Sequence, residues 1–180
     1  MTVFIALLAV VASASADSIP LFVKSQHQAT LQKFLDQHPY YYIAPESLCD
    51  CKDELLQLRI NDPDFEPYYA VGDINDDQIE DFAVALLDKR KVRNGSPVLT
   101  VVIFHGPFSN RKPKDGFVVI PHYTVDRPQV VLYVFKSRIE EKFRLPARLD
   151  IGPGPFGSDD IHTMIYDKKL KKYSVKYFYE

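Results

Sequence analysis

Apolar residues recur at helical spacing in the first third of the chain and in strand-length runs after residue 67. Over Pro20–Gln37 their spacing predicts an amphipathic helix. The pair His38-Pro39 ends this helix, because the residue before a proline avoids helical geometry. A second helix is predicted over Glu46–Arg59, and Asn61-Asp62-Pro63 provides its stop signal. Between the two helices, Tyr40–Ile43 is predicted to be a short extended segment.

Apolar runs of strand length follow, and clusters of Gly, Pro, Asn and Asp separate several of them. The runs are Tyr68–Val71, Phe82–Leu87, Val98–Phe104, Phe117–Ile120, Val130–Phe135, Ile161–Tyr166 and Tyr173–Tyr179. Most connections contain no helical stretch of crossover length, which favours antiparallel pairing. Val98–Phe104 and Val130–Phe135 are apolar throughout, as is typical of central strands buried on both faces. The sequence therefore predicts an α+β fold, with two N-terminal helices followed by a mainly antiparallel β-sheet of about six or seven strands.

The first residues have the pattern of a cleavable signal peptide. An apolar run over Val3–Ala12 precedes Ala14-Ser15-Ala16, which is the A-x-A pattern of a cleavage site. The run is too short to span a bilayer, which takes about twenty apolar residues. The other interpretation is an N-terminal helix that stays buried or acts as an anchor. We expect residues 1–16 to be a signal peptide, residues 17–180 to form a single α+β domain, and the protein to be secreted or periplasmic.

Charge gives no reason to expect a polyanionic partner. The chain has 22 basic and 24 acidic residues and a net charge of -2, so we expect neither nucleic acid nor an anionic membrane as a partner. No later run is long and apolar enough for a transmembrane segment. Lysines alternate with aromatic residues over Lys168–Phe178, which can indicate nucleic-acid binding. The favoured interpretation is a hairpin with a lysine-rich tip, because lysines protect exposed sheet edges from aggregation.

Cys49 and Cys51 are the only two cysteines. An exported protein usually meets oxidising conditions, which favour disulfides. On the predicted helix, however, residues two positions apart point to opposite sides, and a bridge would require distorted backbone. Three interpretations stay open: two thiols without a special role, which we favour, a strained local disulfide, and a redox or soft-metal site.

One acidic segment stands out, with the sequence GDINDDQIED immediately before the apolar run Phe82–Leu87. When Asp73 is counted as position one, oxygen-bearing side chains occupy loop positions one, three, five and nine. The residue at position seven can offer its main-chain carbonyl. Calcium takes six to eight hard oxygen ligands, and alternating residues of a tight loop can direct them to one centre. A bound dication would also offset the repulsion among the carboxylates of this segment. The alternative is a polar turn with solvated carboxylates.

This segment resembles the calcium loop of FG-GAP and VCBS-type repeats, in which G-D-x-N-G-D-G-x-x-D precedes an apolar strand. The ligands that this resemblance implies are the side chains of Asp73, Asn75, Asp77 and Asp81 and the main chain of Ile79. Asp76 and Gln78 replace the family's glycines, and a side chain in a left-handed conformation costs about 1 kcal/mol. We therefore expect weak calcium binding. The loop occurs once, whereas a propeller requires several blades.

The chain shows no established catalytic motif. Its five histidines form no His-Glu-x-x-His, and its serines form no Gly-x-Ser-x-Gly. The single loop, its flanking strands and the Gly154–Asp160 segment resemble small secreted bacterial proteins. We expect an exported, non-catalytic binding or structural domain with a calcium-stabilised acidic loop and a macromolecular or envelope partner. The alternative is a small hydrolase-like enzyme whose site combines histidines and acidic residues at strand ends. The candidates for that site are His105, His122, Asp159 and Asp160.

Overall fold

The computed structural model describes residues 19–49, 51–93, 96–108, 117–125, 131–135, 148–152 and 161–178. The predicted signal peptide, residues 1–16, lies outside these ranges. No helix among the described residues is long and apolar enough to cross a membrane.

The first predicted helix forms as α1 (Ser25–Gln37), which begins later than predicted and ends directly before His38. Its buried residues include Leu31 and Phe34, which stand three positions apart and face the same side. The helix therefore covers a sheet with one apolar stripe, as its spacing predicts.

The second predicted helix is divided by a break. A short 3₁₀ helix, η1 (Glu46–Leu48), is followed by α2 (Lys52–Asn61). Cys49 between them has φ -75° and ψ 109°, which is extended backbone. On extended backbone, the side chains of residues two positions apart point to the same side. Cys49 and Cys51 are accordingly joined in a disulfide, with their Cα atoms 5.1 Å apart. The favoured interpretation as free thiols is wrong, because the helix that would have separated them is interrupted here.

We predict that this disulfide contributes little to stability. The bridge joins residues only two positions apart, and short loops give the smallest gain in chain entropy, about 1–2 kcal/mol. Replacing both cysteines with Ala should lower the melting temperature by a few degrees. Thermal unfolding checks this prediction, with reductant as the control that shifts the parent and leaves the variant unchanged. Loss of cooperative unfolding in the variant would contradict it.

The strands form two antiparallel sheets instead of the single predicted sheet. The first has the order β1-β3-β4-β5, and β2 pairs with β3 beside β1. The second has the order β6-β7-β8-β9. The bounds of the strands are β1 Tyr41–Ile43, β2 Tyr69–Gly72, β3 Asp81–Arg93, β4 Ser96–Phe104, β5 Phe117–Val125, β6 Val131–Phe135, β7 Arg148–Gly152, β8 Ile161–Asp167 and β9 Lys172–Phe178. The α+β class and the antiparallel pairing are confirmed.

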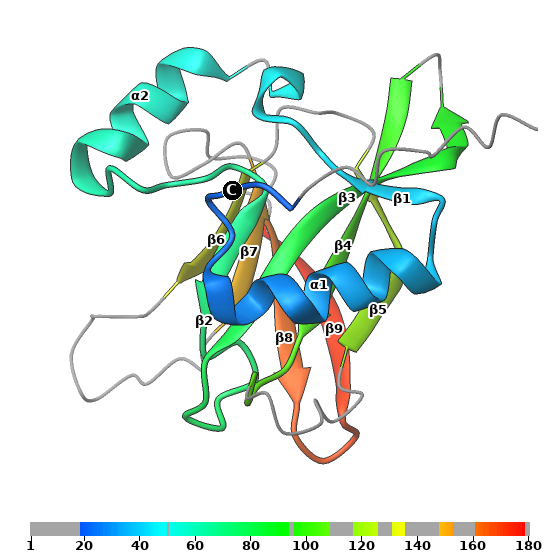
Figure 1. Cartoon of the computed structure of the whole chain (residues 1–180). Coiled ribbons are helices and arrows are strands. Elements are labelled where there is room, and N and C mark those ends of the chain that lie inside the picture. The colour runs from blue at the N-terminus through cyan, green and yellow to red at the C-terminus, as the bar shows by residue number, and fades with distance from the viewer. Residues whose placement is uncertain are drawn as a thin grey trace, which may run out of the picture.

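The first sheet lies between α1 and the second sheet. In Figure 1, α1 crosses in front of β3 and β4, and β8 and β9 lie behind them. Alternate residues of β3 explain this arrangement. Phe82, Val84 and Leu86 belong to the apolar cluster on the α1 side, and the intervening residues belong to the cluster shared with the second sheet. The central strands are therefore buried on both faces, as the apolar run of β4 predicts.

Candidate functional site: the acidic loop and its supports

The acidic loop, residues 73–80, connects β2 to β3. These strands remain paired up to Gly72, which lies opposite Asp81, so the two ends of the loop are held side by side. Figure 1 shows the loop at the lower end of the sandwich, close to the turn between β8 and β9. Every residue that we predicted from the sequence to be a calcium ligand lies within this loop or directly after it.

Asp73 curls the first half of the loop. Its two carboxylate oxygens accept the backbone N–H groups of Asp77 and Gln78, each at 2.9 Å. Asn75 Oδ1 accepts the same Asp77 N–H at 3.0 Å, and Asp77 Oδ1 accepts the N–H of Ile79 at 2.8 Å. The side chains at positions one, three and five therefore point back into the loop, where their oxygens lie near one another.

Two residues of the loop adopt left-handed backbone conformations without being glycine. The φ angles are 59° at Asp76 and 69° at Gln78. At these two positions the FG-GAP and VCBS-type loops, which this segment resembles, have glycine. Asp tolerates this region better than most residues, whereas for Gln it is uncommon. At both positions the loop therefore has a backbone conformation that glycine adopts most readily, at a local cost of about 1 kcal/mol for each residue.

Asp81 is fully buried, and both of its oxygens hold backbone N–H groups. Oδ2 accepts those of Ile74 at 3.0 Å and Asn75 at 3.2 Å. Oδ1 accepts the N–H of Gly106 at 3.0 Å and lies 3.2 Å from Nδ1 of His105. This carboxylate joins the start of the acidic loop to the segment after β4, so it has a structural role whether or not it binds a metal.

His105 connects the loop to the second sheet. Its Nδ1 lies 2.9 Å from Nδ2 of Asn75, and its Nε2 lies 3.3 Å from the hydroxyl of Tyr173 on β9. Its ring also stacks on Tyr173, with 5.8 Å between the ring centroids. Of the other residues nominated for a hydrolase-like site, the side chains of His122, Asp159 and Asp160 lie outside the described part of the chain. The described partners of His105 are Asn75 and Asp81 at the loop and two tyrosines, Tyr166 and Tyr173, of the second sheet.

Lysines from distant parts of the chain neutralise two of the loop's carboxylates. Lys168, in the turn between β8 and β9, places Nζ 2.7 Å from Asp76 Oδ2. Lys24, directly before α1, places Nζ 2.8 Å from Glu80 Oε2. Both pairs are well exposed, so each contributes little by itself. They nevertheless reduce the electrostatic repulsion among the carboxylates of this loop. Through Lys168, the predicted lysine-rich hairpin tip contacts the acidic loop.

Behind the loop, His27 of α1 is completely buried. Its Nδ1 lies 2.6 Å from the hydroxyl of Tyr69, and its Nε2 lies 3.3 Å from Oε1 of Glu80. With the ring proton on Nε2, Tyr69 donates to Nδ1 and Nε2–H faces Glu80, and Gln26 Nε2 lies 3.4 Å from the same Nε2. The backbone N–H of Lys24 donates to the Tyr69 hydroxyl at 3.1 Å. Burial lowers the pKa of His27 to about 4, although Glu80 acts in the opposite direction.

The loop offers carboxylate and amide oxygens, which are the type of donor that calcium binds. Among the described residues, however, no three His, Cys, Asp or Glu side chains are gathered around a point that could hold a metal ion. A calcium site here would depend on Asn75 and on a main-chain carbonyl as well as on carboxylates. Asp81 would also have to exchange one of its present hydrogen-bond partners in order to bind the ion.

Comparison of the chain with protein-family models, with curated proteins and with solved structures finds no match.

Proposed function

We propose that this protein is an exported, non-catalytic binding or structural domain whose acidic loop is stabilised by weakly bound calcium. The observation that carries the calcium part is the left-handed backbone at Asp76 and Gln78. The calcium loop that this segment resembles has glycine at both positions, where glycine adopts this conformation without strain. The export part is supported by the N-terminal sequence pattern alone.

The proposed ligands are the carboxylates of Asp73 and Asp77, the side-chain oxygen of Asn75 and the main-chain carbonyl of Ile79, with Asp81 as the fifth. In Asp73, each oxygen accepts one N–H group, so lone pairs remain for an ion. Calcium bound here would hold the β2–β3 connection in place.

We predict that millimolar calcium raises the melting temperature of the mature protein. A ligand that binds only the folded state stabilises it by RT ln(1 + [L]/Kd). Extracellular calcium modules have Kd values of roughly 0.1–1 mM, so about 2 mM calcium should add ~0.6–1.8 kcal/mol, or a few degrees. Magnesium should stabilise less, because it demands tighter octahedral geometry. Differential scanning calorimetry in chelator, calcium and magnesium measures these shifts.

Asp73→Ala and Asp77→Ala should abolish the calcium response. The matched control is Asp64→Ala, which removes an exposed carboxylate from a different loop and should leave the response intact. If the parent ignores millimolar calcium, or if the two loop variants respond as the parent does, the loop is a polar turn and the calcium proposal is wrong.

A further inference from the structure

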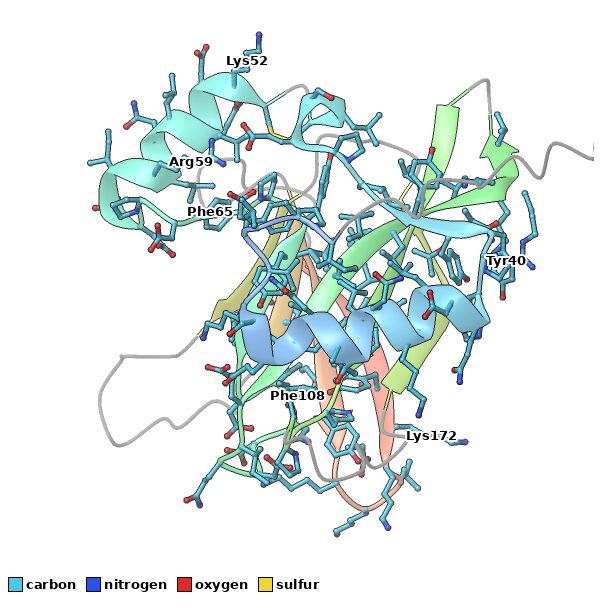
Figure 2. All side chains as sticks on the ribbon, viewed as in Figure 1. Tyr40, Lys52, Arg59, Phe65, Phe108 and Lys172 are labelled. Carbon is cyan, nitrogen blue, oxygen red and sulfur yellow. A yellow bond between two sulfur atoms is a disulfide. The ribbon has the colours of Figure 1, made fainter. Side chains whose placement is uncertain are left out.

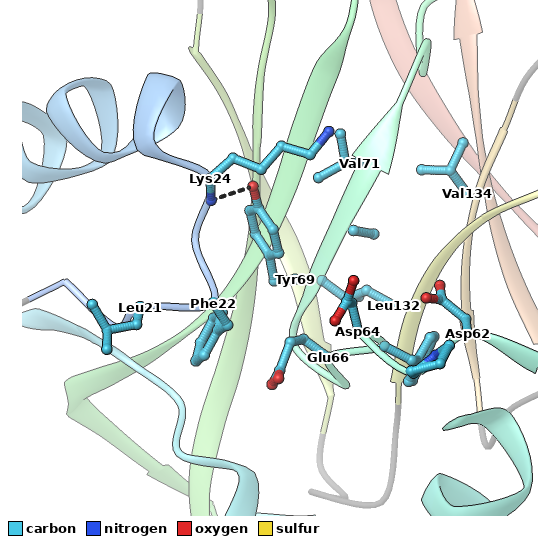
Figure 3. A pocket seen from close by; sticks show the side chains of 13 residues that line it. Leu21, Phe22, Lys24, Asp62, Asp64, Glu66, Tyr69, Val71, Leu132 and Val134 are labelled. Atoms are coloured by element: carbon cyan, nitrogen blue, oxygen red, sulfur yellow. Dashed lines mark hydrogen bonds between the residues drawn. The ribbon is translucent and has the colours of Figure 1, made fainter. Parts of the chain in front are cut away.

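We propose that a groove beside β2 binds an extended peptide segment that combines Lys or Arg with apolar residues. This segment would belong to another protein, so the inference specifies the binding part of the proposed function and is independent of the calcium part. The groove has a volume of about 720 Å³, which lies within the range of ligand sites. Figure 3 shows the side chains that line it. They belong to the segment before α1, to the loop after α2, to β2 and to β6.

The floor of the groove is apolar. Val71 of β2 and Leu132 and Val134 of β6 contribute to it, at the place where the edges of the two sheets meet. The sheets come together closely because Gly72 has no side chain: a Cβ there would lie 2.8 Å from Val134 Cγ1. A ligand in this groove would therefore contact an apolar surface formed by both sheets, mainly through the partly exposed Val71 and Val134.

The wall formed by the segment before α1 is also apolar. Phe22 is tilted against Tyr69 with 6.0 Å between the ring centroids, and both rings line the groove. Leu21 at the rim has 98% of its surface exposed, so its side chain is open to a ligand. A ligand with apolar side chains would cover Leu21.

The opposite wall is acidic. Asp62, Asp64 and Glu66 line it, and Figure 3 shows them on the side of the groove away from Leu21. Asp62 and Asp64 are exposed. Glu66 is partly buried, with Arg59 Nη2 3.6 Å away, but that guanidinium is nearer to Glu46, at 2.7 Å. Burial raises the pKa of Glu66, and Arg59 acts in the opposite direction.

Among the described residues that line the groove, the cation is Lys24, and its Nζ is already paired with Glu80 at 2.8 Å. Arg59 lies near Glu66, but the described lining offers no cation to Asp62 and Asp64. The side chains of Lys and Arg fit this combination, because their aliphatic stems can lie on the apolar floor while their charged ends reach the carboxylates. Apolar neighbours in the same segment would contact Leu21 and Phe22.

The test measures binding of fluorescein-labelled nine-residue peptides to the mature protein by fluorescence anisotropy in chelator. The first peptide alternates Arg and Leu, the second replaces Leu with Gly, and the third replaces Arg with Glu. We expect the first peptide to bind at least tenfold more tightly than either of the others. Equal binding of the Arg-Gly peptide, or equal competition by spermine, would overturn the proposal, because either would show that charge alone is recognised.

The decisive variant is Asp62→Asn with Asp64→Asn, which removes two exposed charges and should weaken binding of the Arg-Leu peptide at least tenfold. Its matched control is Asp53→Asn with Glu54→Gln, which makes the same change in net charge on the exposed start of α2. The control should bind as the parent does. An equal loss in both variants, or no binding to the parent, would overturn the proposal. Since calcium is absent from this assay, neither outcome depends on the acidic loop.

Discussion

Replacing Asp81 with Ala should lower the free energy of unfolding by about 4 kcal/mol, the largest effect that we expect from a single substitution in this protein. The carboxylate accepts three backbone N–H groups, from Ile74, Asn75 and Gly106. Alanine would leave these donors without their acceptor in a buried environment, and hydrogen bonds to a charged group contribute about 1.5–3 kcal/mol each. The melting temperature should fall by roughly 10 °C.

The variant Asp81→Asn tests how much of this stability depends on the negative charge, because Asn has nearly the same shape as Asp. The amide keeps one accepting oxygen but places an NH₂ group against either Gly106 N–H or the pair from Ile74 and Asn75, so it should recover only part of the loss. Both variants are measured by urea unfolding in chelator, with Asp64→Ala as the exposed control that should change stability by less than about 0.5 kcal/mol. If Asp81→Ala unfolds with the parent in chelator and differs only in calcium, Asp81 is a metal ligand without the structural role assigned to it.

The sequence was informative about the individual strands and much less about how they are divided between sheets. The apolar run at residues 98–104 predicts a doubly buried strand, and it is one. Residues 130–135 show a similar apolar pattern, yet β6 lies at the edge of the second sheet. An apolar run reports burial, and both a central strand and an edge strand covered by the facing sheet are buried. β7 was not predicted, because Arg148 and Asp150 interrupt its apolar residues.

The spacing of residues in the sequence predicts the acidic loop itself, but it does not predict the distant residues that hold the loop in place. Alternating oxygen side chains from Asp73 to Asp77 are visible in the sequence and curl into one loop. The residues that hold the loop come from far away. Gly106 is 25 positions from Asp81, and Lys168 is 92 positions from Asp76. Such contacts depend on how strands pair and sheets pack, and no local pattern in one sequence records that.

The buried histidine illustrates the same limit and leads to the second large effect, a loss of stability in mild acid. In the sequence, His27 is one polar residue on the predicted helix, and no motif distinguishes it. In the fold it lies between Tyr69 and Glu80 and stacks on Phe82, with 4.3 Å between the ring centroids. Protonation would put a hydrogen on both ring nitrogens, so Nδ1 could not accept from the Tyr69 hydroxyl, and it would place a charge on a fully buried ring.

The sign of the effect follows from the lowered pKa. Burial lowers the pKa of His27 from 6.5 in the unfolded chain to about 4 in the folded protein. Between these values the unfolded chain binds a proton that the folded protein excludes. The contribution is therefore fully present above about pH 6.5 and is lost as the pH falls towards 4. The full difference corresponds to about 3 kcal/mol, which should appear in urea unfolding measured at several values between pH 7 and pH 4.

The variant His27→Gln separates the pH dependence that His27 causes from the pH dependence that the carboxylates cause. Glu80 and Asp88 have lowered pKa values, so their contributions are lost mainly below about pH 4.5. Glu66 has a raised pKa and acts in the opposite direction. Gln can accept from Tyr69 or donate to Glu80 but cannot titrate. The variant should be less stable than the parent at pH 7, because it loses the stacked ring, and its stability should change much less between pH 6.5 and pH 4.5. If the parent and His27→Gln lose stability equally over this range, the histidine is protonated in the folded protein at no cost, and its burial does not cause the loss of stability in acid.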